Sequence, residues 1–182
     1  EMCIRDRAAI VGGAGRDADH GRILDGWANE EYMAAWDKIL AVDLRAPLLL
    51  MHHVAQHMVA RGGGGKIVNV SSSSAYRAVG VNLAYASAKA ALSHLTRIVA
   101  AELGPYDINV NAVAPGLTET PLTTRGRDVV ALQQQVTAGP LANFFQRVSQ
   151  PEDVAETIRF LCLPASRQIT GQVIHTSAGA IV

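Results

Sequence analysis

The fold is decided by residues 66–116, which read KIVNVSSSSAYRAVGVNLAYASAKAALSHLTRIVAAELGPYDINVNAVAPG. The stretch opens with a short β-branched run from Lys66 to Val70, which predicts a strand. A long helix is expected from Ala84 to Leu103, because Gly104 and Pro105 end it. A second strand follows from Asp107 to Val113. A strand, a helix and a strand in this order predict two parallel strands joined by a helical crossover.

The same alternation of strands and helices continues on both sides of this unit. Glycines after apolar runs mark the turns, and Asn29 is a suitable N-cap. The segment from Pro115-Gly116 to Val148 is polar, and we interpret it as a mobile loop. The remaining expected elements are a strand at Ala8 to Val11, a helix from Glu30 to about Ala41 that continues, bent, past Pro47, a buried helix at Leu48 to Val59 ended by Gly62 to Gly65, a helix that starts at Ser149 with Pro151, Glu152 and Asp153, and a last strand at Ile169 to His175.

This order predicts an α/β fold with a doubly wound parallel sheet, a Rossmann-like three-layer α/β/α arrangement. In such a sheet, ligands bind beyond the carboxyl ends of the strands. Three segments follow expected strands directly, namely Gly12 to Gly15, Ser71 to Ser74, and Pro115 with Gly116. We therefore expect these three segments to converge on one crevice.

Composition excludes several classes of function. The 182 residues have a formal net charge of zero and no basic block, so we predict neither nucleic-acid nor membrane-surface binding. No apolar stretch reaches the roughly 18 residues of a membrane span, and the start lacks a signal-peptide core, so we predict a cytoplasmic protein. His52, His53 and His57 lie close together without a suitable carboxylate, and we predict no metal site.

The chemistry is concentrated in Tyr85 and Lys89, which are spaced as Tyr-x-x-x-Lys. On a helix this spacing places both side chains on one face, about one turn apart. The ammonium group can then stabilise the phenolate and lower the pKa of the tyrosine from its usual value of about 10. Such a tyrosine is suited to general acid–base catalysis. Ser72 lies thirteen residues before Tyr85, at the end of an expected strand.

With these residues in place, the chain resembles the short-chain dehydrogenase/reductase family over about residues 8–182, in particular members like the 3-oxoacyl-[acyl-carrier-protein] reductases. Ser72, Tyr85 and Lys89 match the catalytic Ser, Tyr and Lys of the family in type and spacing. Further matches are Pro115-Gly116 with Thr120 to a Pro-Gly-x-x-x-Thr segment beside the nicotinamide, Arg147 with Pro151-Glu152-Asp153, and Ile169-Thr170-Gly171 before the last strand.

The resemblance implies a site with two parts. Its catalytic residues are Ser72, Tyr85, Lys89 and Asp43, the last standing where the family has an Asn whose backbone carbonyl helps to hold a water linked to the lysine. Its cofactor is NAD or NADP, of undetermined type, and the residues expected to bind it are Gly12, Gly13, Ala14, Gly15, Tyr85, Lys89, Pro115, Gly116, Thr118 and Thr120.

The chain also departs from the family at several places. Gly12 to Gly15 stand for Asn-Asn-Ala-Gly, and Ser177-Ala178-Gly179 stand for Asp-Gly-Gly. The Gly-rich turn that cradles a pyrophosphate does not occur in the chain, so we expect the first strands, roughly 60 to 80 residues in two strand–helix–strand units, to be missing ahead of Ala8. Residues 1–7 resemble a translated sequencing adapter, and we interpret them as a non-native scar outside the fold. Residues 8–182 are then the C-terminal part of a single domain.

The function implied is hydride transfer between a nicotinamide and a secondary alcohol or ketone, with Tyr85 as the general acid–base. The expected partners are a small carbonyl or alcohol substrate and, by resemblance, further copies of the chain in a homodimer or homotetramer. Two alternatives stay open: epimerase or dehydratase chemistry on nucleotide sugars, and a non-catalytic dinucleotide-binding protein or inactive truncated fragment.

Overall fold

The fold of the described residues is built on a parallel sheet. The computed structural model describes residues 3–5, 29–78, 81–124 and 128–181. Its sheet has four strands in the order β1-β2-β3-β4, and every neighbouring pair is parallel. The strands are β1 (Cys3–Arg5), β2 (Gly65–Val70), β3 (Ile108–Pro115) and β4 (Val173–Thr176). The expected α/β fold with a parallel sheet is confirmed.

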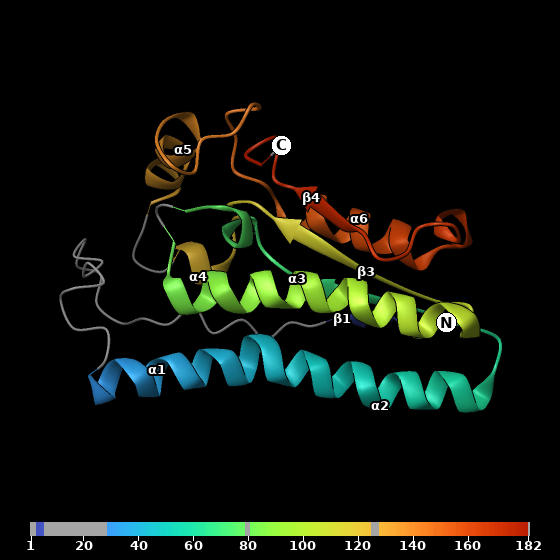
Figure 1. The fold of residues 1–182 in the computed structure, drawn as a ribbon. Coiled ribbons are helices and arrows are strands. Elements are labelled where there is room, and N and C mark those ends of the chain that lie inside the picture. Colours follow the sequence, from blue (N-terminus) through green and yellow to red (C-terminus); the bar gives the residue numbers. More distant parts are fainter. Residues whose placement is uncertain (1–2, 6–28, 79–80, 125–127, 182) are drawn as a thin grey trace.

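Helices cover both faces of this sheet (Figure 1). On one face lie α1 (Glu30–Leu40), α2 (Ala46–Arg61) and α3 (Leu83–Leu103), and on the other lies α6 (Pro151–Cys162). A π-helical turn, η1 (Ala41–Arg45), joins α1 to α2. The shorter elements are η2 (Ser73–Tyr76), η3 (Gly104–Tyr106), α4 (Pro121–Thr124), α5 (Val129–Thr137) and η4 (Pro164–Ser166).

The core follows the two-residue period of β2. Ile67 packs in a buried cluster with Met51, Met58 and Leu92, which come from α2 and α3. Val68 packs in a separate cluster with residues of α6 on the opposite face. Because side chains alternate along a strand, Asn69 and Ser71 point to the same side as Ile67, toward α3. This alternation places polar side chains at the end of β2 beneath the helix that carries Tyr85 and Lys89.

Two expected elements differ from the structure after β3. The segment from 117 to 148 contains α4 and α5, because Leu132 and Val136 are one helical turn apart and are buried together with Val148. The segment interpreted as a polar loop therefore contains two helices. β4 starts at Val173 and not at Ile169, because Gly171 has a positive φ of 69° that interrupts the extended backbone.

Two other details of the helices are also corrected. The N-cap of α6 is Gln150, whose backbone N–H donates to the Asp153 carboxylate at 2.8 Å, and Ser149 instead forms a parallel bridge with Thr118. The helix α2 is not largely buried, because three successive leucines are exposed on it: Leu48, Leu49 and Leu50.

The N-terminal part of the chain gives one further difference. Cys3–Arg5 pairs with Lys66 to Val68 as the edge strand of the sheet. Three residues of the segment 1–7 therefore pair with the sheet, and the interpretation of this segment as a non-native scar stays a prediction. The strand expected at Ala8 to Val11 lies outside the described residues. Within the part that the structure describes, no helix has the length and apolar character needed to cross a bilayer.

Candidate active site

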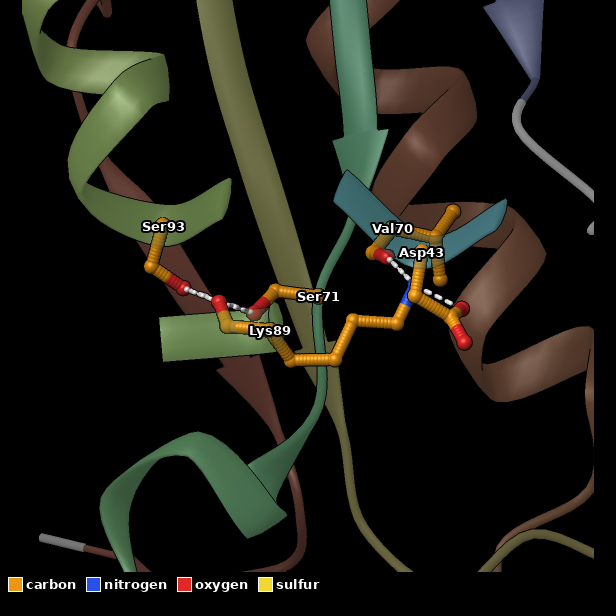
Figure 2. Close-up of polar contacts among 5 residues, drawn as sticks. All are labelled: Asp43, Val70, Ser71, Lys89 and Ser93. Carbon is orange, nitrogen blue, oxygen red and sulfur yellow. Dashed lines mark hydrogen bonds and ion pairs between the residues drawn. The ribbon is translucent and has the colours of Figure 1, made fainter. Parts of the chain in front are cut away.

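The site is centred on Lys89, whose ammonium group is held between two oxygen atoms (Figure 2). Its Nζ lies 3.1 Å from Oδ1 of Asp43 and donates a 3.0 Å hydrogen bond to the backbone carbonyl of Val70. The side chain of Lys89 is 3% exposed and that of Asp43 is fully buried. A charged pair removed from water in this way is stabilised by mutual attraction and hydrogen bonds, and each charge depends on the other.

The helix α3 places Tyr85 one turn before Lys89. The side chain of Asn82 caps the helix by accepting the N–H of Tyr85 at 3.0 Å. The Lys89 Nζ lies 5.7 Å from the centre of the Tyr85 ring. The tyrosine is partly buried, packed against Ala84 and Ala88 on its own helix and Ile39 of α1. The predicted pairing of Tyr85 with Lys89 is therefore present in space.

Hydroxyl groups tie α3 to the end of β2. Ser71 donates to the carbonyl of Lys89 at 3.0 Å, and its Oγ lies 2.6 Å from Oγ of Ser93 (Figure 2). Two residues before Ser71, within β2, the amide of Asn69 donates to Thr96 Oγ1 at 2.9 Å. These buried contacts hold the backbone of α3 in place against β2, and they thereby fix the position of Lys89 relative to the end of that strand.

Ser72 follows β2 directly and is 8% exposed. Its hydroxyl accepts the N–H of Ser74 at 3.1 Å and so caps the short helix η2. Its backbone is extended, with φ −159° and ψ 150°. Ser72, Lys89 and Tyr85 therefore come from one strand end and the helix that packs on it, as the spacing in the sequence predicts.

Asp43 reaches Lys89 because of the π-helical turn between α1 and α2. Pro47, four residues after Asp43, has no backbone N–H, so an ordinary α-helical bond to the Asp43 carbonyl is impossible there. The wider turn accommodates this, and Ala46 donates its N–H to the carbonyl of Ala41, five residues earlier. The fully buried carboxylate of Asp43 is thereby held against α3 (Figure 2).

The second part of the site follows β3, the neighbour of β2. Gly116 donates its N–H to the carbonyl of Thr176 at 3.2 Å, and a Cβ built on Gly116 would lie 3.0 Å from Cα of Ser177. Thr118 donates its hydroxyl to the Gly116 carbonyl at 3.1 Å. The hydroxyl of Thr120 lies 3.2 Å from that of Thr123 in α4. Since β2 and β3 are paired in register, Ser72 and the Pro115-Gly116 turn emerge at the same edge of the sheet.

The end of β4 adds partly buried groups that titrate. The ring of His175 packs edge to face on Tyr76 of η2, with centroids 4.6 Å apart. Burial lowers the pKa of His175, and burial also lowers that of Arg77, because each loses hydration of its charged form. Partial burial therefore favours the neutral form of His175 beside the ring of Tyr76.

The structure thus brings together Asp43, Tyr85 and Lys89, and it places Ser72 two residues after β2. Pro115 ends the adjacent strand β3, and Gly116, Thr118 and Thr120 follow it. The four expected cofactor contacts Gly12, Gly13, Ala14 and Gly15 lie outside the described residues. Among the described residues, His, Cys, Asp and Glu side chains do not gather in groups of three that could hold a metal ion.

Sequence reasoning missed two features of the site. The four serines from Ser71 to Ser74 were treated as one segment, although the alternation of β2 assigns Ser71 to the side of α3. The role expected for Asp43 was that of a backbone carbonyl, but its side chain pairs with Lys89. The signal for this pairing was the carboxylate itself, since a buried acid needs a cationic partner.

The parallel sheet and the Tyr85–Lys89 pair are features to compare with those of dinucleotide-dependent oxidoreductases. The family model described as enoyl-(acyl carrier protein) reductase matches residues 10–180. The chain belongs to the short-chain dehydrogenase/reductase family, as the resemblance predicted.

Individual relatives agree with this assignment. The mouse (3R)-3-hydroxyacyl-CoA dehydrogenase is 37% identical over 145 residues, which are 79% of this chain and 54% of the relative. The solved 3-oxoacyl-[acyl-carrier protein] reductase of Brucella melitensis has 34% identity and a TM-score of 0.71, over 82% of this chain and 54% of that one. A 4-hydroxyisoleucine dehydrogenase complexed with NADH has 25% identity and a TM-score of 0.78, over 98% and 68%. The chain spans about half the length of the curated relatives it matches.

Proposed function

We propose that this chain carries the catalytic part of an NAD(P)-dependent oxidoreductase that interconverts a secondary alcohol and a ketone. The observation that carries the proposal is the position of Lys89, with Nζ 5.7 Å from the ring of Tyr85 at the strand end that bears Ser72. A cation beside a phenol favours the phenolate, and a hydroxyl nearby can hold the oxygen that gains or loses a proton.

The donors present also fit a nicotinamide nucleotide. An ammonium group has three N–H donors. Lys89 donates one to the Val70 carbonyl and forms an ion pair with Asp43, and we propose that another N–H binds the ribose hydroxyls. Gly116 allows close approach of backbone, because a side chain there would press against Ser177. Residues 12–15 are proposed to add backbone contacts. NADH is bound by the related 4-hydroxyisoleucine dehydrogenase, and either NAD or NADP is proposed here.

A bound nicotinamide would supply or accept the hydride. In the proposed reaction Tyr85 passes the proton to or from the substrate oxygen, and Ser72 donates a hydrogen bond to that same oxygen. Lys89 stabilises the phenolate form of Tyr85, and the buried setting strengthens this interaction relative to water. Thr118 and Thr120, after β3, would hold the nicotinamide in place.

The test uses the protein extended to the length of its relatives, with ketone reduction followed by NAD(P)H absorbance. Tyr85→Phe is expected to lower kcat by at least about a hundredfold, the usual contribution of general acid–base catalysis, with cofactor binding unchanged in a fluorescence titration. The matched control is Tyr106→Phe, because Tyr106 is exposed in η3. Retained turnover in Tyr85→Phe would refute the proposal.

We also propose that a second copy of the chain packs on the outer face of α2 and α3. An apolar hollow of about 510 Å³ lies between these helices and is lined by Leu48, Val59 and Leu103, among others. On α3, the small side chains Ala90 and Ala91 are exposed, which permits close approach of another helix. This surface agrees with the dimer expected by resemblance.

The association is tested by light scattering after size exclusion. Leu48→Glu, which places a charge in the lining of this hollow, is expected to shift the protein toward the monomer. A charge added at the exposed Met33 of α1 by Met33→Glu is the control and should leave the mass unchanged. An unchanged mass for Leu48→Glu would contradict the proposal.

A further inference from the structure

The contact between Asp43 and Lys89 has a consequence for the ionisation of Tyr85. In the structure the acid presents its side chain to Nζ at 3.1 Å, and its exposure is zero. The negative charge therefore lies next to the cation that the proposed function assigns to Tyr85. A neutral amide at this position would leave the full positive charge of Lys89 acting on the phenol.

We propose that Asp43 is a positioning residue that fixes Lys89 directly and, by its charge, makes Tyr85 ionise at a higher pH than an amide at the same position would. The inference rests on the proposed function, because it concerns the same proton-transfer group. It goes beyond the proposed function by giving the Asp43 carboxylate a role in setting the pH at which Tyr85 ionises.

The charged and titratable groups around Lys89 can be named from each element packed against it. The turn η1 contributes Asp43, the helix α3 contributes Tyr85, and β2 contributes only the carbonyl of Val70. Ser71 and Ser93 add hydroxyls that bind the Lys89 backbone and carry no charge near neutral pH. In the described part of the chain, Asp43 is thus the group whose charge opposes that of Lys89.

Electrostatics gives the direction and the size of the effect. The Asp43–Lys89 pair has no net charge, and its ammonium group lies 5.7 Å from the centre of the Tyr85 ring. Removing the carboxylate leaves the positive charge of Lys89 without a compensating anion, and the Val70 carbonyl and the forming phenolate both favour the protonated lysine. For a charge several ångströms away at an effective dielectric constant of about 20, the expected change is a fall of about one unit in the pH midpoint of tyrosinate formation.

The test follows tyrosinate absorbance near 295 nm during a pH titration of the chain. The protein has four tyrosines. For each protein we therefore subtract the titration curve of the same protein carrying Tyr85→Phe, and the difference is the titration of Tyr85. Asp43→Asn is expected to move the Tyr85 midpoint down by about one unit, a tenfold change in proton affinity. The control Asp37→Asn, on the exposed side of α1, should leave the midpoint within about 0.2 units at this distance and exposure.

An unchanged or raised midpoint in Asp43→Asn would overturn the inference. If that variant does not fold, Asp43→Ser removes the same charge with a smaller side chain and is judged by the same shift. If neither neutral variant folds, the carboxylate serves the fold and not the tuning of Tyr85, and the inference is wrong. The titration needs neither cofactor nor substrate, so its failure is separate from loss of the Tyr85→Phe effect on turnover.

Discussion

Replacing Lys89 by Met would leave a carboxylate buried without its cation. Asp43 is fully buried and its Oδ1 lies 3.1 Å from Nζ of Lys89. Methionine fills a similar volume with apolar atoms, so the main change is the loss of the ammonium group. We therefore expect Lys89→Met to destabilise the fold at neutral pH through the charge that it strands.

Two estimates give the size of this effect. Breaking a buried ion pair by removing one partner costs about 3–5 kcal/mol. Asp43 can avoid the penalty by taking up a proton. An aspartate has an ordinary pKa of about 3.9, so keeping it protonated at pH 7 costs about 4 kcal/mol, at 1.36 kcal/mol per pH unit. The two estimates agree, and for a domain of this size about 4 kcal/mol corresponds to a fall in Tm of roughly 10 °C.

Urea denaturation followed by far-UV circular dichroism measures the loss directly. The pKa of Asp43 in folded Lys89→Met lies above its unfolded value, so the deficit should be smallest near pH 4 and should grow as the pH rises toward 7. The double variant Asp43→Asn with Lys89→Met should regain at least half of the loss. A loss below about 1 kcal/mol at pH 7, or a double variant no more stable than Lys89→Met, would refute the reasoning.

Gly64→Ala should destabilise the protein by about 1–3 kcal/mol more than Gly63→Ala in urea denaturation: both have positive φ, but only at Gly64 would a Cβ meet a backbone oxygen, that of Asp107, at 2.5 Å. Equal losses would show that the clash relaxes. His175 has a pKa lowered by burial, so the unfolded chain takes up the proton first as the pH falls. The contribution of neutral His175 to stability should be full above about pH 6.5 and decline below it. Between pH 7.5 and 5.5, the free energy of unfolding of His175→Gln should therefore fall less than that of the unchanged protein.

Much of the fold could be predicted because its elements obey local rules. The β-branched run before Ser71 predicted β2 to within a residue, and α3 begins one residue before the expected Ala84 and ends at Leu103, before the expected Gly104. The pair Tyr85 and Lys89 could be predicted for the same reason, since a four-residue spacing on a helix fixes their geometry.

The parts that failed depend on tertiary contacts. α5 looked like a polar loop because only Leu132 and Val136 mark its buried face, and their partner Val148 is far along the chain. The exposure of Leu48 to Leu50 on α2 could not be read from a dense apolar run, since hydropathy does not say whether a neighbour covers it. The pairing of Asp43 with Lys89 required the path of the chain through η1.

That path also determines how this region tolerates insertions and deletions. A π-helical turn holds about one residue more than an α-helical turn, so everything after it is rotated by about 100° relative to an unbroken helix. Deleting a single residue within Ala41–Arg45 would remove the extra residue of the wide turn and shift the buried stripe of either α1 or α2 out of phase with the sheet. Substitutions here change one side chain at a time, whereas a one-residue deletion alters the phase of two helices at once.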